Sequence, residues 1–170
     1  MSDPSKTTYG ERSPDAPPEL GAFAFLVGKW DGTGTTKLPD GKVAEFAVTW
    51  IGRYVLDGMA IADEMHSVGP DGSPYLGISL RHYDRDKHTW IIEYLNVSYS
   101  FLRKQVNVDS GSVTVNGRTV TVTSESPDVN IREHYHVADM DNWVYRLDVS
   151  TDGAKSWTKG QIEMTLHRLE

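Results

Sequence analysis

The sequence predicts an all-β fold, a single antiparallel up-and-down β-barrel of about ten strands with a short N-terminal helical plug. Three observations favour it. Apolar and polar residues alternate along segments of strand length, turn residues separate these segments at regular intervals, and Trp30 is followed at two-residue spacing by Gly32 and Gly34. One large aromatic and two gaps on the same strand face are typical of a strand that bends sharply to close a barrel.

The chain begins with a polar arm. Residues 1–19 contain four prolines and no apolar run, so we expect them to be disordered or loosely docked, and we assign residues 20–170 to one barrel domain. The apolar run 20–27 is too short for a long helix but long enough for one or two turns that plug the barrel. The residues that could cap the core are Phe23, Phe25 and Leu26.

Turn-forming residues divide the rest of the chain into strand-length segments. They fall at 39–41, 57–58, 69–72, 84–86, 109–111, 116–117, 127–128, 139–141 and 152–153. Apolar stripes with a period of two lie between them and predict strands, and Asn116-Gly117 predicts a tight hairpin. A sandwich would show the same alternation. However, sequential hairpins need no long crossover, and closure removes exposed sheet edges, so a barrel is favoured.

Composition excludes several classes of function. The chain has 170 residues, a formal net charge of −7 and no cysteine. The negative charge opposes nucleic acid as a partner, and without cysteine there can be no disulfide, thiolate zinc site or cysteine nucleophile. No stretch resembles a signal peptide or the roughly 18 apolar residues of a membrane span. We therefore expect a cytoplasmic protein with no membrane partner, which could form a homodimer.

Four segments carry a family resemblance. Residues 25–34, the Tyr83-Asp84 turn, Trp90 and the closing residues 165–168 resemble family 1579 of the domains of unknown function. Proteins of that family look like calycins, the lipocalin-like β-barrels, and the resemblance covers most of the chain from about Leu20 onward. It implies a lipocalin-like barrel and brings no assigned reaction.

The resemblance also implies roles for single residues. In lipocalin-like barrels the tryptophan of a Gly-x-Trp motif lies across the barrel base, under an arginine from a late strand; Trp30 and Arg168 match these positions, with a structural role. A second, looser resemblance is to nitrobindin-like haem barrels, in which a histidine on a late strand holds the iron, and His167 matches that position. Since Met164 and Leu166 share one row, His167 belongs to the opposite row and faces solvent unless a bulge shifts the phase.

The densest polar cluster alternates along one predicted strand. Parity places Arg132, His134 and His136 on one face, and Glu133 and Tyr135 on the other. If the even-numbered row lines the barrel, two imidazoles and a guanidinium can anchor a carboxylate or move a proton near neutral pH. If the odd-numbered row lines it, the even-numbered row is an ordinary outer face, since charged groups tend to remain exposed. The sequence leaves both arrangements open.

A metal site is the other interpretation of this cluster. His134 and His136 could share an ion with Glu64 and His66 from an earlier strand. The spacing does not match a cupin motif, which has a Glu soon after the His pair. We predict no metal and no cofactor.

Two further positions depend on strand parity. Only one of the neighbours Arg81 and His82 can face the interior, and the apolar row that His82 shares favours the histidine. Tyr94 shares a row with Trp90 and Ile92, which indicates burial, and a buried phenol needs a partner for its hydroxyl. Tyr94 could contact a ligand or bind another side chain.

The first functional hypothesis is a binding module. The barrel cavity would hold a small apolar or aromatic molecule, a carboxylate included, between aromatic walls and a few orienting polar groups. The predicted ligand-binding residues are Phe46, Trp50, His82, Trp90, Tyr94, Arg132 and His134.

Alternative functions use the same cavity. The main one is a cofactor-free enzyme of the isomerase, lyase or hydratase type, with His134 or His136 as proton carrier and Arg132 stabilising an enolate or carboxylate. A haem-binding barrel is the second alternative, and a closed core whose loops contact a protein partner is the third. The sequence has no serine-nucleophile elbow, phosphate loop, dinucleotide fingerprint or His-Glu-x-x-His motif, so serine catalysis and nucleotide use are unsupported.

Overall fold

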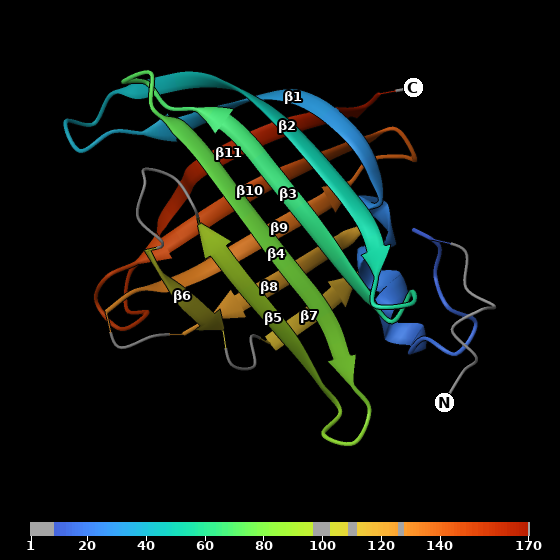
Figure 1. The fold of residues 1–170 in the computed structure, drawn as a ribbon. Helices are drawn as coiled ribbons and strands as arrows, with labels where there is room; N and C mark the ends of the chain where they lie inside the picture. Colours follow the sequence, from blue (N-terminus) through green and yellow to red (C-terminus); the bar gives the residue numbers. More distant parts are fainter. Residues whose placement is uncertain (1–8, 97–102, 109–111, 126–127, 170) are drawn as a thin grey trace.

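One antiparallel sheet of eleven strands curls into a nearly closed barrel in the part of the chain that the structure describes (Figure 1). The structure is a computed structural model and describes residues 9–96, 103–108, 112–125 and 128–169, with the backbone alone for 103–108. The strands are β1 (Gly28–Lys37), β2 (Val43–Val55), β3 (Ala60–Val68), β4 (Pro74–Asp84), β5 (Thr89–Asn96), β6 (Arg103–Val108), β7 (Ser112–Asn116), β8 (Thr119–Ser124), β9 (Asn130–Val137), β10 (Asn142–Ser150) and β11 (Thr158–Arg168). The predicted fold class, an up-and-down calycin-like barrel with a helical plug, is confirmed.

Strands that follow one another in sequence lie side by side in the sheet. The order is β6-β5-β4-β3-β2-β1-β11-β10-β9-β8-β7, so the first and last strands, β1 and β11, also pair. Their pairing runs from Trp30 opposite Arg168 to Thr36 opposite Ile162. β6 and β7 end the order, and within the described backbone each pairs on one side only. The predicted Asn116-Gly117 hairpin joins β7 and β8, with Asn116 opposite Thr119.

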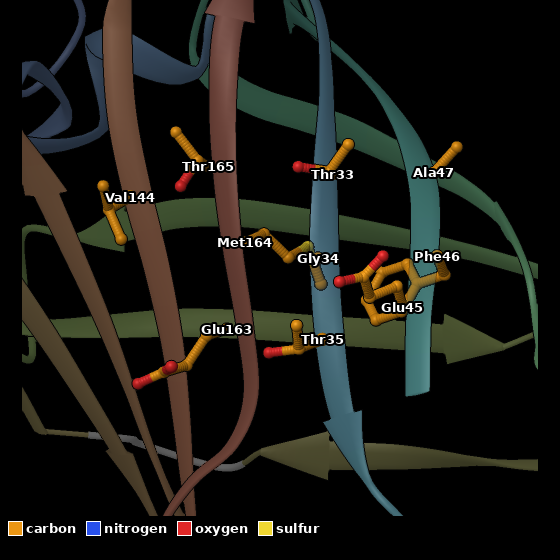
Figure 2. A pocket seen from close by; sticks show the side chains of 10 residues that line it. All are labelled: Thr33, Gly34, Thr35, Glu45, Phe46, Ala47, Val144, Glu163, Met164 and Thr165. Carbon is orange, nitrogen blue, oxygen red and sulfur yellow. The ribbon is translucent and has the colours of Figure 1, made fainter. Parts of the chain in front are cut away.

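The glycines of β1 let neighbouring groups approach closely. A Cβ atom at Gly32 would overlap the backbone carbonyl oxygen of Thr165 on β11, and one at Gly34 would lie 2.5 Å from the ring of Phe46. Figure 2 shows Gly34 with the Phe46 and Met164 side chains beside it. The two gaps that the sequence places after Trp30 therefore serve the packing of the strand.

A 3-10 helix, η2 (Pro18–Leu26), closes one end of the barrel (Figure 1). Proline at its first position suits the helix start, because the missing N–H has no helical partner there. The side chains of Leu20, Phe23 and Leu26 are fully buried. The Phe23 ring meets the Trp90 ring edge-on at a centroid distance of 4.9 Å. The predicted plug is thus part of the hydrophobic core.

The residues before the plug pack against the turn between β2 and β3. Ser13 and Ala16 are buried, and the Ser13 N–H donates a hydrogen bond of 3.1 Å to the Gly58 carbonyl.

The base of the barrel carries the arrangement that the family resemblance implies. The Arg168 guanidinium lies 4.0 Å from the centroid of the Trp30 ring, and Arg168 Nη1 donates to the Val27 carbonyl at 3.1 Å. Trp30 Nε1 donates to the Leu26 carbonyl at 3.0 Å. The expected stacking of Arg168 on Trp30 is confirmed. These contacts link the last residue of β11 to the residues at the end of the plug.

Aromatic rings fill the half of the barrel next to η2. The Trp143 ring meets the Trp30 ring at 5.9 Å and the Trp50 ring at 5.2 Å, both nearly perpendicular. The Phe25 ring contacts Trp143 at 5.5 Å from the plug side. Edge-to-face pairs of this kind add stability beyond the area they bury.

Candidate functional site

A cavity of about 430 Å³ lies inside the barrel, beyond the aromatic core. Side chains from β2, β3, β4, β5, β8, β9, β10 and β11 line it, and most of its surface is apolar. Among the described residues the lining comprises Trp50, Asp63, Met65, Tyr75, Gly77, Ser79, Arg81, Ile92, Tyr94, Ser124, Glu125, Val129, Ile131, Glu133, Tyr145, Leu147, Ile162 and Met164.

Small residues on β4 leave room for this space. The inward row of β4 reads Tyr75, Gly77, Ser79 and Arg81. A Cβ atom at Gly77 would lie 2.6 Å from the hydroxyl oxygen of Tyr94 on β5, so this ring lies directly over the glycine. A larger apolar residue at these positions would fill part of the cavity.

A buried ion pair borders the cavity on the side of the plug. Arg81 Nη1 pairs with Asp63 Oδ2, and both side chains are 2% exposed. The guanidinium is enclosed by the rings of Phe23 and Tyr135, whose centroids lie 5.2 and 5.9 Å from it. Arg81 Nη2 donates to the Tyr135 hydroxyl at 3.1 Å. The charge of Arg81 is therefore neutralised by a carboxylate of the protein itself.

Glu133 on β9 presents a carboxylate to the cavity. Its Oε1 atom accepts hydrogen bonds from the Tyr135 hydroxyl at 3.2 Å and from the Tyr145 hydroxyl at 3.0 Å. The glutamate is half-buried, whereas Tyr135 and Tyr145 are buried. Two fixed phenol donors hold this carboxylate in one place, and a partly exposed carboxylate can accept further hydrogen bonds.

The phenols around Glu133 remain protonated donors. Burial raises the pKa of Tyr135, and the negative charge of Glu133 raises it further. The same two causes raise the pKa of Tyr145 well above its ordinary value. On the far side of the cavity the hydroxyls of Tyr75 and Tyr94 hydrogen bond to each other, and burial raises the pKa of both.

Two of the predicted ligand-binding residues line the cavity, and two lie elsewhere in the interior. Trp50 and Tyr94 are lining residues. Phe46 is half-buried over Gly34, and Trp90 is buried between Phe23 and Tyr83 under the plug. Phe46 and Trp90 therefore pack the core and do not border the cavity.

The other predicted site residues of β9 lie on the outer face of the barrel. Arg132 stacks on the Trp157 ring at 3.8 Å, and His136 is exposed, with its Nδ1 atom 3.0 Å from Thr119 Oγ1. The catalytic hypothesis placed Arg132, His134 and His136 in the cavity, but the odd-numbered row faces it instead. The reason is that the odd-numbered row contains the large buried ring of Tyr135, which fits only the interior.

His134 belongs to an outer-face network. Its Nδ1 atom lies 3.1 Å from Thr121 Oγ1, and its Nε2 atom lies 3.2 Å from Asp148 Oδ2. Arg146 and the Gly160 N–H also bind Asp148. Burial opposes ionisation of Asp148, but these hydrogen bonds outweigh it and lower the pKa. The network ties β8, β9, β10 and β11 together and has no described cavity beside it.

The orientation expected for Arg81 and His82 is reversed. Arg81 is 1% exposed and lines the cavity, and His82 is half-buried on the outer row. The apolar row of β4 that shares this outward direction is only partly buried. The polar residue faces inward because Asp63 supplies its counter-charge from the same face of the neighbouring strand β3, where it lies opposite Ser79 and diagonal to Arg81.

No histidine side chain is among the described residues that line the cavity. All six histidines of the chain lie in the described residues, and none of them is a lining residue. His167 is exposed and hydrogen bonds to Asn142 Oδ1 at 2.5 Å, as its row predicts. Glu64 pairs with Arg53 at 3.1 Å and with His66 at 3.6 Å on the outer face. Within the described part of the chain, no three His, Cys, Asp or Glu side chains are grouped to hold a metal ion.

A second pocket, of about 700 Å³, is open to solvent (Figure 2). It crosses β2, β1, β11 and β10, with the glycine at position 34 at its centre. Threonines and two glutamates border it, Glu45 on β2 and Glu163 on β11. Phe46 and Met164 also line it, and it is more open to solvent than the barrel cavity.

Apart from Tyr94, sequence reasoning missed the polar groups whose side chains line the cavity. Asp63, Tyr75 and Glu133 were not among the predicted site residues, and Arg81 was assigned to the outside. The sequence did contain one signal. Arg81 shares its strand row with the small residues Gly77 and Ser79, and a charged residue beside small residues is typical of the wall of a cavity. Pairing across β3 and β4 cannot be read from single strands.

Comparisons with known proteins agree with this fold. The family described as "Protein of unknown function (DUF1579)" matches residues 18–168, so the chain belongs to that family and the resemblance is confirmed. No curated protein matches the sequence. No helix in the described residues is long and apolar enough to cross a membrane.

Solved structures share the barrel at low sequence identity. The crystal structure of Rv2717c from M. tuberculosis is similar with a TM-score of 0.61 and 19% identity, over 92% of this chain and 100% of that chain. The S-type phycobiliprotein lyase CPES from Guillardia theta is similar with a TM-score of 0.59 and 13% identity, over 87% of this chain and 90% of that chain. At these identities the likeness shows a common fold.

Proposed function

We propose that the barrel binds one small, largely apolar molecule in its interior cavity. The observation that carries this proposal is the cavity itself, about 430 Å³ of space among mostly apolar side chains. Ligand pockets in proteins measure roughly 300–1,000 Å³, and ordinary interiors leave few voids larger than a water molecule. A hollow of this size is thus better explained by a guest than by imperfect packing.

Two further observations support a guest molecule. Trp50 Nε1 and Ser124 Oγ are buried polar atoms of lining residues without a hydrogen-bond partner among the described residues. Buried donors normally find a partner, and a ligand or an ordered water is a usual source. The fold is also shared with a protein named a phycobiliprotein lyase, which agrees with a role in small-molecule binding for such barrels.

Binding of a neutral fluorescent probe tests the proposal. N-phenyl-1-naphthylamine emits strongly only in an apolar environment, so titration of the protein with this probe should give a saturable, one-site increase in emission. Leu147→Trp on β10 should abolish most of the increase, because the larger side chain occupies the cavity that Leu147 lines.

Val144→Trp is the matched control. Val144 lies on the same strand but points outward and is 38% exposed, so this variant should bind the probe as the unmodified protein does. Equal binding by both tryptophan variants, or no saturable binding by the unmodified protein, would contradict the proposal.

A further inference from the structure

The charges around the cavity are unequal. Among the described lining residues there is one cation, Arg81, and there are three carboxylates, on Asp63, Glu125 and Glu133. Glu125 is exposed, Asp63 forms an ion pair with Arg81, and Glu133 is half-buried. The described lining therefore has an excess of negative charge, and Glu133 is the member of it that faces the interior without a cationic partner in any described ion pair.

Most of the donors of Arg81 are taken by protein groups. Its side chain is 2% exposed, and Asp63 and the Tyr135 hydroxyl bind Nη1 and Nη2. The remaining Nε atom is buried and has no hydrogen-bond partner among the described residues. The rings of Phe23 and Tyr135 lie over the guanidinium, and Asp63 neutralises its charge, so Arg81 adds no net positive charge to the cavity.

Glu133, by contrast, is fixed and partly open. The Tyr135 and Tyr145 hydroxyls both donate to its Oε1 atom, which sets the direction of the carboxylate. A carboxylate has about four acceptor positions, so two phenol donors leave capacity for a ligand. Ile131, two residues before it on β9, and Leu147, opposite it on β10, add apolar side chains to the lining beside the carboxylate, and a charged hydrogen bond is stronger in apolar surroundings.

We infer that the cavity selects a cationic ligand, a protonated amine on an apolar or aromatic body, with Glu133 as its counter-ion. This inference rests on the proposed function and narrows the ligand class, which the sequence had left open to a carboxylate. A carboxylate ligand meets the uncompensated charge of Glu133 in a poorly hydrated space and is rejected. A neutral molecule of the same shape binds with intermediate affinity.

Three probes with one naphthalene body test the charge preference at pH 7. They are 2-naphthylmethylamine, 2-naphthylmethanol and 2-naphthoate, measured by quenching of protein tryptophan emission and by calorimetry. We expect the amine to bind about tenfold tighter than the alcohol, a difference of about 1.4 kcal/mol, because a hydrogen bond between charged groups is stronger than one to a neutral hydroxyl. The naphthoate should bind more weakly than the alcohol.

Glu133→Gln assigns the preference to one residue. The amide keeps the shape of the side chain and an acceptor for the two phenols, but it removes the charge. The affinity for the amine should therefore fall to within about twofold of the affinity for the alcohol, which itself should change little. Glu163→Gln is the matched control, because Glu163 is exposed on the outer face of β11 (Figure 2). It should leave all three affinities unchanged.

The outcomes separate the two proposals. If the alcohol binds in the cavity but the amine does not bind tighter, or if the naphthoate binds best, the charge inference is overturned while the binding function stands. If the amine preference survives in Glu133→Gln, Glu133 is not the counter-ion. If none of the three probes and no N-phenyl-1-naphthylamine binds, the proposed function fails and this inference fails with it.

Discussion

The arginine at position 81 shows how one residue can serve structure inside a cavity wall. Its ion pair with Asp63 is almost fully removed from water, and burial of two charges is expensive unless each is paired and hydrogen bonded. The Tyr135 hydroxyl and the enclosing Phe23 ring supply the remaining contacts. Neither charge can be deleted alone without leaving the other buried and unpaired.

Arg81→Met should therefore destabilise the protein strongly. Breaking a buried pair by removing one partner costs about 3–5 kcal/mol, and urea unfolding followed by tryptophan emission should show a loss of this size. The double variant Asp63→Leu with Arg81→Met should recover much of the loss, because no buried charge remains. A single variant as stable as the unmodified protein would show that the pair is not closed in solution.

The buried phenols make stability sensitive to alkaline pH. Burial, together with the charge of Glu133, raises the pKa of Tyr135 and Tyr145 above the value of about 10 that unfolded tyrosine has. Between these values the unfolded state releases protons that the folded state keeps, so the free energy of unfolding falls as the pH rises above about 10.

An absorbance titration at 295 nm measures this linkage. The phenolate signal of Tyr135 and Tyr145 should appear only together with unfolding, because burial raises the pKa of both groups in the folded state. In Tyr145→Phe the late, unfolding-linked part of the signal should shrink. Smooth ionisation of every tyrosine near pH 10 in the folded protein would contradict the burial of these groups.

At the scale of the element, the plug holds the barrel end through side chains rather than helical hydrogen bonds. η2 is a short 3-10 helix, a conformation with little stability of its own. Phe23 from its centre contacts β4, β5 and β9 through Arg81, Trp90 and Tyr135. The plug thus joins strands that are not neighbours in the sheet and supports the ion pair at the cavity wall.

Phe23→Ala should be among the most damaging substitutions in the chain. Truncation of a fully buried phenylalanine costs about 3–5 kcal/mol, since transfer energy and cavity formation add. Phe25→Ala is the comparison, because Phe25 lies two residues on in the same helix and is half-buried, so its loss should be smaller. Urea midpoints for the two variants measure the difference; equal midpoints would mean that the plug contributes no specific contact.

For the molecule as a whole, the sequence predicts the barrel well and its interior poorly. Alternation, regular turns and the glycines after Trp30 depend on local geometry, so strands, hairpin and plug follow from the chain alone. Alternation gives two rows per strand but not which row faces inward. The usual rule, apolar side inside, fails on β4, where Leu80 and its row neighbours turn outward and Arg81 turns inward. Which residues line a cavity depends on how much space their side chains leave and on which charged or hydrogen-bonding partners lie beside them. Both depend on how the strands pair.

The arrangement of strands also predicts where the barrel opens first. β1 and β11 each have hydrogen-bonded neighbours on both sides and join the two ends of the barrel domain, whereas β7 pairs with β8 alone in the described backbone. Local opening is easiest where a strand has few partners and exposed hydrogen bonds. Val115 on β7 is 58% exposed, while Leu166 on β11 is fully buried.

Native-state amide hydrogen exchange should therefore rank the strands. Amides of β1 and β11 should exchange only through global unfolding, so their protection should change with the free energy of unfolding measured in urea. Amides of β7 should exchange through local opening, so their protection should not depend on that free energy. Saturation with the neutral naphthylmethanol probe should add protection across the cavity-lining strands β4, β5, β9 and β10, because a guest that binds only the folded state stabilises it by mass action. At about 100 times Kd this amounts to about 2.7 kcal/mol.

The comparison of β7 with β11 tests the ranking itself. Equal protection of the amides of β7 and β11 would show that the sheet closes between β6 and β7 in solution, so that the molecule has no weak edge.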